Sequence, residues 1–211
     1  MFKPSERLGI IFSLLEKVEV FADIGADHGY VAEAMLKADK CERAIVTDIS
    51  AKCLKKAEEN LSKNFEGRYV SIVTDGLKGV PFADEVLIAG MGGELISDII
   101  SSADFLPEIF VIQPMKNTDS VRRTLIKSGY KFVNDYTFKD KKFYDVIKAR
   151  RGSDSYSEEE IEFGRDNLRD KSAAFREMIE IKRSKLFSAL QYAENKEVIL
   201  EEIAKLDKVL K

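Results

Sequence analysis

Short β-branched or aromatic runs alternate with helical patterns from Val18 to about Arg151. This alternation predicts a parallel sheet with crossover helices, because parallel strands can be joined only by long connections. The predicted strands are residues 19–24, 43–48, 69–73, 85–89 and 109–113. The predicted helices are residues 30–37, 51–64, 93–102 and 118–128, with a further amphipathic helix at 5–17 before the sheet.

A hairpin and a helical tail are expected after the last crossover helix. Residues 130–138 and 143–149 flank the charged turn 139–142 and predict two antiparallel strands. Beyond residue 153 the chain is charged and helix-forming, which predicts a boundary near Ser155. We therefore expect an α/β Rossmann-like domain over 1–155 and a small helical domain over 156–211.

The tail carries its own start signal and two apolar stripes. Ser157 with Glu160 predicts a capping box. Apolar residues at 175, 179, 186, 190 and 193, and again at 199, 203, 206 and 210, predict two helices. With a turn at 194–196 they could pack as an antiparallel coiled coil, although the heptads are too few for periodicity alone to decide.

Size and composition exclude several classes. A chain of 211 residues has room for one core and an accessory element. It lacks an apolar run of roughly 20 residues, and residues 1–5 lack the features of a secretory signal, so we expect a cytoplasmic protein without membrane contact. Cys41 and Cys53 form no CxxC pair, so neither a disulfide framework nor a metal site is expected. The net charge of −3 restricts any RNA-binding surface to a local basic patch.

The stretch VFADIGADHG at 20–29 reads as a strand, a sharp turn and a helix start, which predicts a cofactor site at the end of the first strand. Gly25 allows close approach of a ligand, and Gly29 allows close packing of the helix. Asp27 stands where a dinucleotide fingerprint has its middle glycine. A carboxylate there would repel a pyrophosphate but suits the cationic groups of S-adenosylmethionine. Asp23 and His28 complete the predicted turn, although His28 could equally be a helix-start residue.

Three further strand ends carry candidate ligand residues. An aspartate about 20 residues after the first turn suits the hydroxyls of a ribose, an aspartate after the third strand could hold an adenine amine, and the AGMGG turn after the fourth lets donor and acceptor come close. Taken singly, these aspartates are more often caps or turn residues, but together they favour one nucleotide-cofactor crevice. The predicted cofactor residues here are Asp48, Ile49, Asp75, Gly76, Gly90 and Met91.

The motifs Arg7-Leu8, ADIGADH at 22–28, AGMGG at 89–93 and QPM at 113–115 resemble those of the bacterial tRNA adenine-22 N1-methyltransferase family. The similarity extends to Phe143-Tyr144 in the hairpin and to the tail. It implies a class I methyltransferase fold with a C-terminal coiled-coil domain, S-adenosylmethionine as methyl donor and tRNA as partner. The chain departs from the usual first motif at Ala26, Gly29 and Ala32, where the family has serine, alanine and proline.

The implied reaction needs positioning more than a base, because N1 of neutral adenine has a free in-plane lone pair. If N1 is paired or stacked, exposing it costs a few kcal/mol. The turn from Gly90 to Gly93, with Gly92 and Gly93 as its candidate catalytic residues, is expected to form one wall of the acceptor pocket, and Gln113 to hydrogen-bond the base edge. Tyr30 or Tyr144 could stack on the base, or equally pack in the core.

Arginines are the candidates for RNA contact. Those at the start of the chain and after Asn117 could meet phosphates, and those of the tail recur at four or seven residues and could form a basic ridge. Interspersed acids favour the alternative of an ion-paired, solvated helix. The candidates are Arg7, Arg122, Arg123, Arg165, Arg169, Arg176 and Arg183.

The sequence leaves two other functions open. The chain could methylate a small molecule or a protein, or it could sense S-adenosylmethionine without turnover. No Asn-Pro-Pro-Tyr signature follows the fourth strand, so the N1 assignment rests on the resemblance. A monomer is expected.

Overall fold

The computed structural model describes residues 5–193 and 195–211, and its centre is a seven-stranded sheet. The strand order is β3-β2-β1-β4-β5-β7-β6; β1 to β5 run parallel, and β7 lies antiparallel to both β5 and β6. The predicted sheet and hairpin are confirmed. The strands are β1 Val18–Ile24, β2 Cys41–Asp48, β3 Tyr69–Val73, β4 Glu85–Met91, β5 Ile109–Pro114, β6 Tyr130–Asp140 and β7 Lys142–Arg151.

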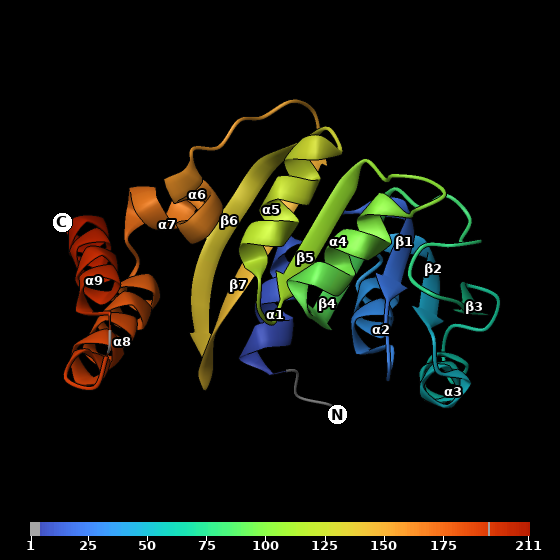
Figure 1. Cartoon of the computed structure of the whole chain (residues 1–211). Helices are drawn as coiled ribbons and strands as arrows, with labels where there is room; N and C mark the ends of the chain where they lie inside the picture. The colour runs from blue at the N-terminus through green and yellow to red at the C-terminus, as the bar shows by residue number, and fades with distance from the viewer. Residues whose placement is uncertain (1–4, 194) are drawn as a thin grey trace.

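Helices cover both faces of the parallel strands (Figure 1). Phe21 and Val111 point toward one set of helices, whereas their neighbours Ala22 and Ile112 point toward the other. Burial on both faces is what a parallel sheet requires. The first set is α1 Glu6–Leu14, α2 Tyr30–Lys37 and α3 Ala51–Leu61, and the second is α4 Gly93–Ser101 and α5 Thr118–Lys127.

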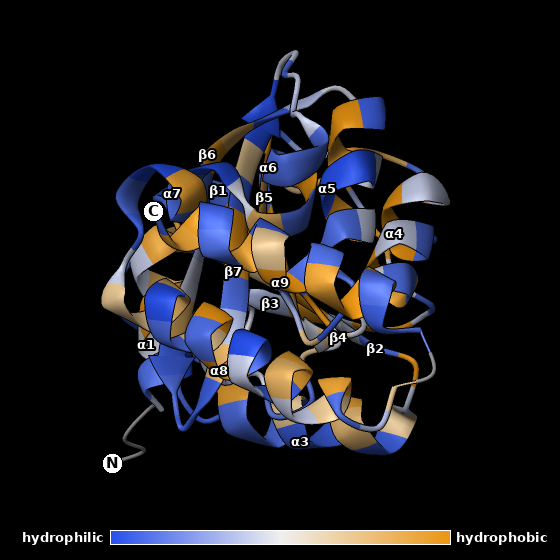
Figure 2. Ribbon diagram, turned by 60° about the vertical axis from the view of Figure 1, so that its left-hand side comes forward, coloured by the Kyte–Doolittle hydropathy of each residue, from blue (hydrophilic) through white to orange (hydrophobic). Residues whose placement is uncertain are grey.

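The tail consists of α6 Glu158–Phe163, α7 Arg165–Asp170, α8 Ala173–Leu190 and α9 Lys196–Leu210. The predicted capping box at Ser157 and Glu160 is present. Arg176 near the start of α8 donates to the carbonyl oxygen of Leu210 at the end of α9, and Lys182 further along α8 pairs with Glu202 nearer the start of α9, so the two helices run antiparallel. Apolar and polar residues alternate along both helices (Figure 2), and the buried apolar ones, Phe175, Ile179, Leu206 and Val209, form a cluster with Phe163. Glu194, in the predicted turn, lies outside the described residues.

Arg122 joins the tail to the sheet. Its side chain is 1% exposed and reaches from α5 to Asp135 on β6, with nitrogen–oxygen distances of 2.8 to 3.1 Å. It also donates to the carbonyl oxygens of Ile161 and Glu162 near the end of α6. The prediction that Arg122 contacts RNA is therefore wrong, because this residue lies on the buried face of its helix. The boundary near Ser155 stays a prediction.

In the described ranges, no helix combines the length and apolar character needed to cross a bilayer.

Candidate cofactor and substrate site

The first turn and the end of β4 meet at the carboxyl edge of the sheet. The backbone N–H groups of Gly25 and Ala26 donate to the carbonyl oxygen of Thr47, at 2.8 and 2.9 Å, which fastens the turn to β2. Gly25 has a φ of +73°, and a Cβ there would lie 2.1 Å from Cε of Met91. The Met91 side chain thus lies across the turn, and the fold brings these two predicted cofactor residues together.

Two carboxylates of the first turn have opposite environments. Asp23 is buried and accepts a backbone hydrogen bond from Ala32, and burial raises its pKa to about 7. Asp27 is exposed, with a φ of +40°, and its carboxylate lies 3.2 Å from Nζ of Lys56 and 3.6 Å from Nε2 of His28. Partial burial raises the pKa of Asp27, but Lys56, His28 and a hydrogen bond from Cys53 together lower it by more. Asp27 is thus the charged carboxylate, and Lys56 already neutralises part of its charge.

The predicted ribose residue forms a local turn. Asp48 Oδ1 accepts a hydrogen bond from the Ser50 N–H at 2.8 Å, at the start of α3, which engages one of its two carboxylate oxygens. Ile49 beside it is 76% exposed. Asp75 follows β3 and lies 3.0 Å from Nζ of Lys78. Asp48 is the last residue of β2 and Asp75 follows the neighbouring strand β3, and each has a turn or ion-pair role of its own.

Two of the predicted glycines are explained by helix packing. A Cβ at Gly76, where φ is +65°, would lie 2.8 Å from the Ile99 side chain of α4. A Cβ at Gly29, where φ is +66°, would lie 3.0 Å from Cβ of Ala57 on α3. Both positions let a helix approach the turn closely. The helix that Gly29 admits is α3, whereas the sequence predicted close packing of the helix that follows it, α2.

The glycine turn at the end of β4, from Gly90 to Gly93, presents two open positions and one closed one. A Cβ at Gly90 would lie 3.6 Å from Nη1 of Arg7, and one at Gly92 would lie 3.4 Å from Cε of Lys116. Both neighbours are ends of cationic side chains. Gly93 is buried, and a Cβ there would lie 2.0 Å from the backbone oxygen of Asn117. The predicted role of Gly93 as a pocket wall is corrected, because it packs against backbone instead.

Gln113 is fully buried, and both ends of its amide are engaged. Nε2 donates to the Pro114 carbonyl oxygen at 2.7 Å, and Oε1 accepts from Nη1 of Arg7 at 2.7 Å. The predicted direct contact of Gln113 with a base edge does not fit this geometry. The Arg7 guanidinium carbon lies 5.7 Å from the centre of the Tyr144 ring. Arg7, Gln113 and Tyr144 therefore form one cluster, which sequence reasoning did not assemble.

Tyr30 lies on the cofactor side of the site. Its ring stacks on the His28 imidazole, with centroids 5.0 Å apart. Stacking of Tyr30 on a target base stays a prediction.

The remaining predicted RNA-binding arginines have protein partners. Arg123 pairs with Glu158, and in the tail the guanidinium groups contact neighbouring acids or, for Arg176, carbonyl oxygens. The ion-paired helix alternative describes these side chains better than an open basic ridge. The tail contacts are those of Arg165 with Asp154 and Glu160, Arg169 with Asp166 and Asp170, Arg176 with Lys171 and Leu210, and Arg183 with Asp207.

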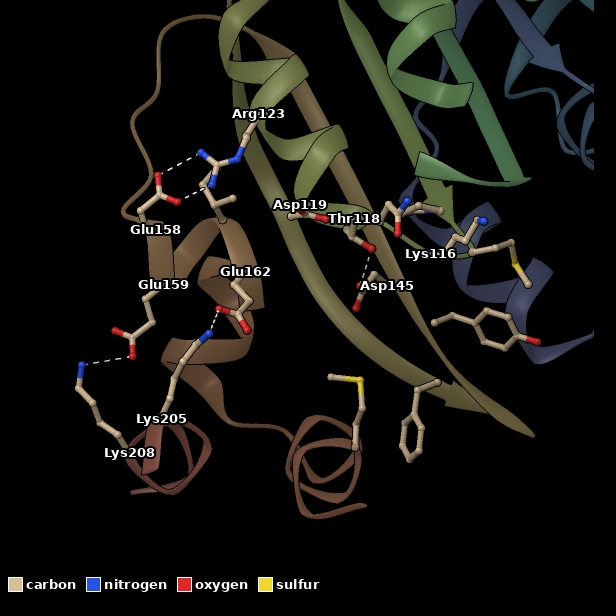
Figure 3. A pocket seen from close by; sticks show the side chains of 17 residues that line it. Lys116, Thr118, Asp119, Arg123, Asp145, Glu158, Glu159, Glu162, Lys205 and Lys208 are labelled. Atoms are coloured by element: carbon tan, nitrogen blue, oxygen red, sulfur yellow. Dashed lines mark hydrogen bonds and ion pairs between the residues drawn. The ribbon is translucent and has the colours of Figure 1, made fainter. Parts of the chain in front are cut away.

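A cavity of about 840 Å³ lies beside the end of β5, between α5, the hairpin and the tail (Figure 3). Met115, Lys116 and Tyr144 are among its lining residues, and Lys116 also lies against Gly92, so the cavity adjoins the glycine turn. Residues 23–29 of the first turn do not line it. On the tail side each cation is paired with an acid of α6. These pairs are Arg123 with Glu158, Lys205 with Glu162 and Lys208 with Glu159. Sequence reasoning missed this cavity and Lys116, whose only signal was its place after the QPM motif.

No group of histidine, cysteine, aspartate and glutamate side chains in the described part of the chain could hold a metal ion.

A sheet of this order, with glycine turns and carboxylates at the ends of its parallel strands, defines a Rossmann-like protein with a nucleotide-cofactor site. The sequence matches the family model described as "Methyltransferase domain" over residues 4–147. The chain belongs to this methyltransferase family.

The chain is also similar to individual methyltransferases. The tRNA (adenine(22)-N(1))-methyltransferase of Bacillus subtilis is 31% identical over 157 residues, which span 71% of this chain and 66% of that protein. The structure of M. capricolum TrmK in complex with S-adenosyl-homocysteine is similar over all of both chains, with 25% identity and a TM-score of 0.89. The B. subtilis TrmK crystal structure shares the fold over all of both chains, with 23% identity and a TM-score of 0.88. The resemblance expected from the motifs is confirmed.

Proposed function

We propose that this protein transfers the methyl group of S-adenosylmethionine to N1 of adenine 22 in tRNA. The observation that carries the proposal is the similarity over the full chain, tail included, to a TrmK bound to the cofactor product, together with the B. subtilis relative named for this reaction. We further propose that the protein acts as a monomer in the cytoplasm, with a catalytic domain over 1–155 and a coiled-coil domain over 156–211.

The geometry at the first turn fits the proposed methyl donor. Gly25 allows the ligand to approach the backbone, Met91 lies over the turn as a flexible apolar wall, and Asp48 suits the ribose hydroxyls. The donor supplies an electrophilic methyl on a sulfonium. The other proposed contacts are Asp23, Asp27, His28, Gly29, Ile49, Asp75, Gly76 and Gly90.

The proposed acceptor side contains no group that must act as a base. Since N1 of adenine attacks with its own lone pair, the protein has to hold the base in line with the methyl group. Gly90 and Gly92 offer the open backbone at which a flat base can lie, and Tyr144 offers a ring close by. The methylated base becomes a cation, so Arg7 and Lys116 are better suited to phosphates than to the base.

Affinity for S-adenosylmethionine should increase as the pH rises from 5.5 to 7.5. The pKa of Asp23 is raised to about 7, so this carboxyl is mostly neutral at pH 5.5 and mostly ionised at pH 7.5. A cationic ligand binds the ionised form better, by at most about tenfold per pH unit below the pKa. Titration calorimetry checks this, and Asp23→Asn is the matched control, expected to bind weakly without this pH dependence. Identical profiles for the two proteins would contradict the role of Asp23.

Methyl transfer to tRNA transcripts tests the proposed activity. With labelled S-adenosylmethionine, a transcript with adenine at position 22 should accept one methyl group, and the same transcript with guanine there should accept none. Equal labelling of both transcripts would show that the methylated nucleotide is not the one at position 22. Cofactor binding with no labelling of bulk tRNA would favour a small-molecule acceptor or a sensor.

A further inference from the structure

The Arg7 side chain has a fixed place at the end of β5. Its backbone N–H donates to Oδ2 of Asp140 at 3.0 Å, which fastens the first turn of α1 to the tip of the hairpin. A carboxylate at a helix start is stabilising in its own right. Because this attachment uses the backbone, the guanidinium group is not needed for it.

Neutral groups hold the guanidinium in place. Nη1 donates to Gln113 Oε1, and the ring of Tyr144 lies 5.7 Å from the guanidinium carbon. The Gln113 amide cannot turn without losing its second bond to the Pro114 carbonyl oxygen. Over residues 5–193 and 195–211, no carboxylate pairs with the Arg7 side chain. Of its five N–H donors, one serves Gln113, so most of the fork is available to a ligand.

The Arg7 guanidinium lies beside the proposed acceptor pocket. Nη1 lies 3.6 Å from where a Cβ would stand on Gly90, and Tyr144 also lines the 840 Å³ cavity. Lys116 lies against Gly92, two residues along the same turn. Two cations thus flank the turn at which the acceptor would lie, and among the residues that the structure describes no acid neutralises the Arg7 guanidinium.

We propose that Arg7, held by Gln113 and Tyr144, binds the phosphate adjoining the nucleotide to be methylated, and so selects a polynucleotide over a free nucleoside. This inference rests on the proposed function. A guanidinium fork matches the geometry and charge of a phosphate, whereas it would oppose the positive charge that N1 methylation creates on the base. Gln113 is then a positioning residue that acts through Arg7.

The test compares Arg7→Gln, Arg7→Lys and the control Arg43→Gln with the parent. Arg43 is an exposed arginine in β2 that pairs with Glu19 at the opposite end of the strands. The readouts are kcat and KM with a tRNA transcript, tRNA affinity as a function of KCl concentration, affinity for S-adenosylmethionine, and Tm. Arg7→Gln should raise KM by about tenfold, the loss expected for one charged hydrogen-bonded contact.

The salt dependence separates a phosphate contact from a structural role. Loss of one contact should reduce the slope of log affinity against log salt by about 0.7 to 0.9. Arg7→Lys should have the salt slope of the parent, because lysine keeps the charge. Its KM should lie between those of the parent and Arg7→Gln, because lysine lacks the forked donor geometry. Arg43→Gln should match the parent, and no variant should change cofactor affinity. Arg7→Gln should lower Tm by at most a few degrees, because the buried Gln113 Oε1 loses its donor.

Two outcomes would overturn the inference. One is an Arg7→Gln protein whose slope and KM equal those of the parent, which would leave the proposed function intact. The other is a fall in Tm and in cofactor affinity together, which would make Arg7 a structural residue. Failure of the parent itself to methylate tRNA would instead count against the proposed function, while the binding slope would still report on Arg7.

Discussion

Replacing Arg122 by alanine is expected to destabilise the protein by about 3–5 kcal/mol. The substitution leaves the Asp135 carboxylate, itself 1% exposed, without its guanidinium partner, and it removes the donor that serves the Ile161 and Glu162 carbonyl oxygens. Burial lowers the pKa of Arg122, but the charge and hydrogen bonds of Asp135 raise it by more, so the residue is charged. Urea unfolding followed by circular dichroism measures the loss.

The neighbouring arginine is the matched control for this prediction. Arg123 pairs with Glu158 at the surface, where both side chains are more than half exposed. Such pairs contribute at most about 1 kcal/mol. Arg123→Ala should therefore unfold close to the parent. If Arg122→Ala and Arg123→Ala were equally stable, the buried pair would not be the connection between tail and sheet that the structure indicates.

The second large effect is expected at Gly93, where alanine should cost about 1–3 kcal/mol or more. The added Cβ would meet the Asn117 oxygen at 2.0 Å and the Lys116 oxygen at 2.8 Å. Both are backbone atoms, which cannot move aside as the end of a side chain can. The Gly93 N–H also donates to the Lys116 oxygen, so the two turns are joined where the substitution would push them apart.

Gly92→Ala is the control for that experiment. Gly92 has a φ of −70°, and its added Cβ would meet only the flexible end of Lys116, at 3.4 Å. We expect Gly92→Ala to unfold within about 1 kcal/mol of the parent. The two variants are compared by urea unfolding. A Gly93→Ala protein as stable as Gly92→Ala would show that the turn relaxes freely, against the close backbone contact described above.

The order of elements was predictable because the parallel strands are short β-branched or aromatic runs, whereas the helices between them have a helical period of apolar residues. The structure moves most ends by three residues or fewer, for example at α3, which ends at Leu61 and not at residue 64. The hairpin runs on to Asp140 and resumes at Lys142, because Lys141 turns the chain with a φ of +60°. The turn of the hairpin is therefore shorter than the four-residue turn predicted at 139–142.

The partners of individual side chains were not predictable in the same way. Arg7 and Gln113 are 106 residues apart, and only the folded sheet brings them together. For Arg122 a signal existed, since it lies between Val121 and Leu125 on the buried face of α5. The neighbouring acids of the tail were visible in the sequence, but their pairing with each arginine depends on how α6 to α9 pack.

The measurement that tests the central claim most directly is the identity and position of the methylated nucleoside. A tRNA transcript is incubated with S-adenosylmethionine and the protein, digested, and analysed by mass spectrometry, and the position is mapped by primer extension. The account predicts N1-methyladenosine at position 22, with Asp23→Asn and Asp48→Asn losing product through weaker cofactor binding. Methyl groups on another nucleoside, or on adenine at another position, would contradict it.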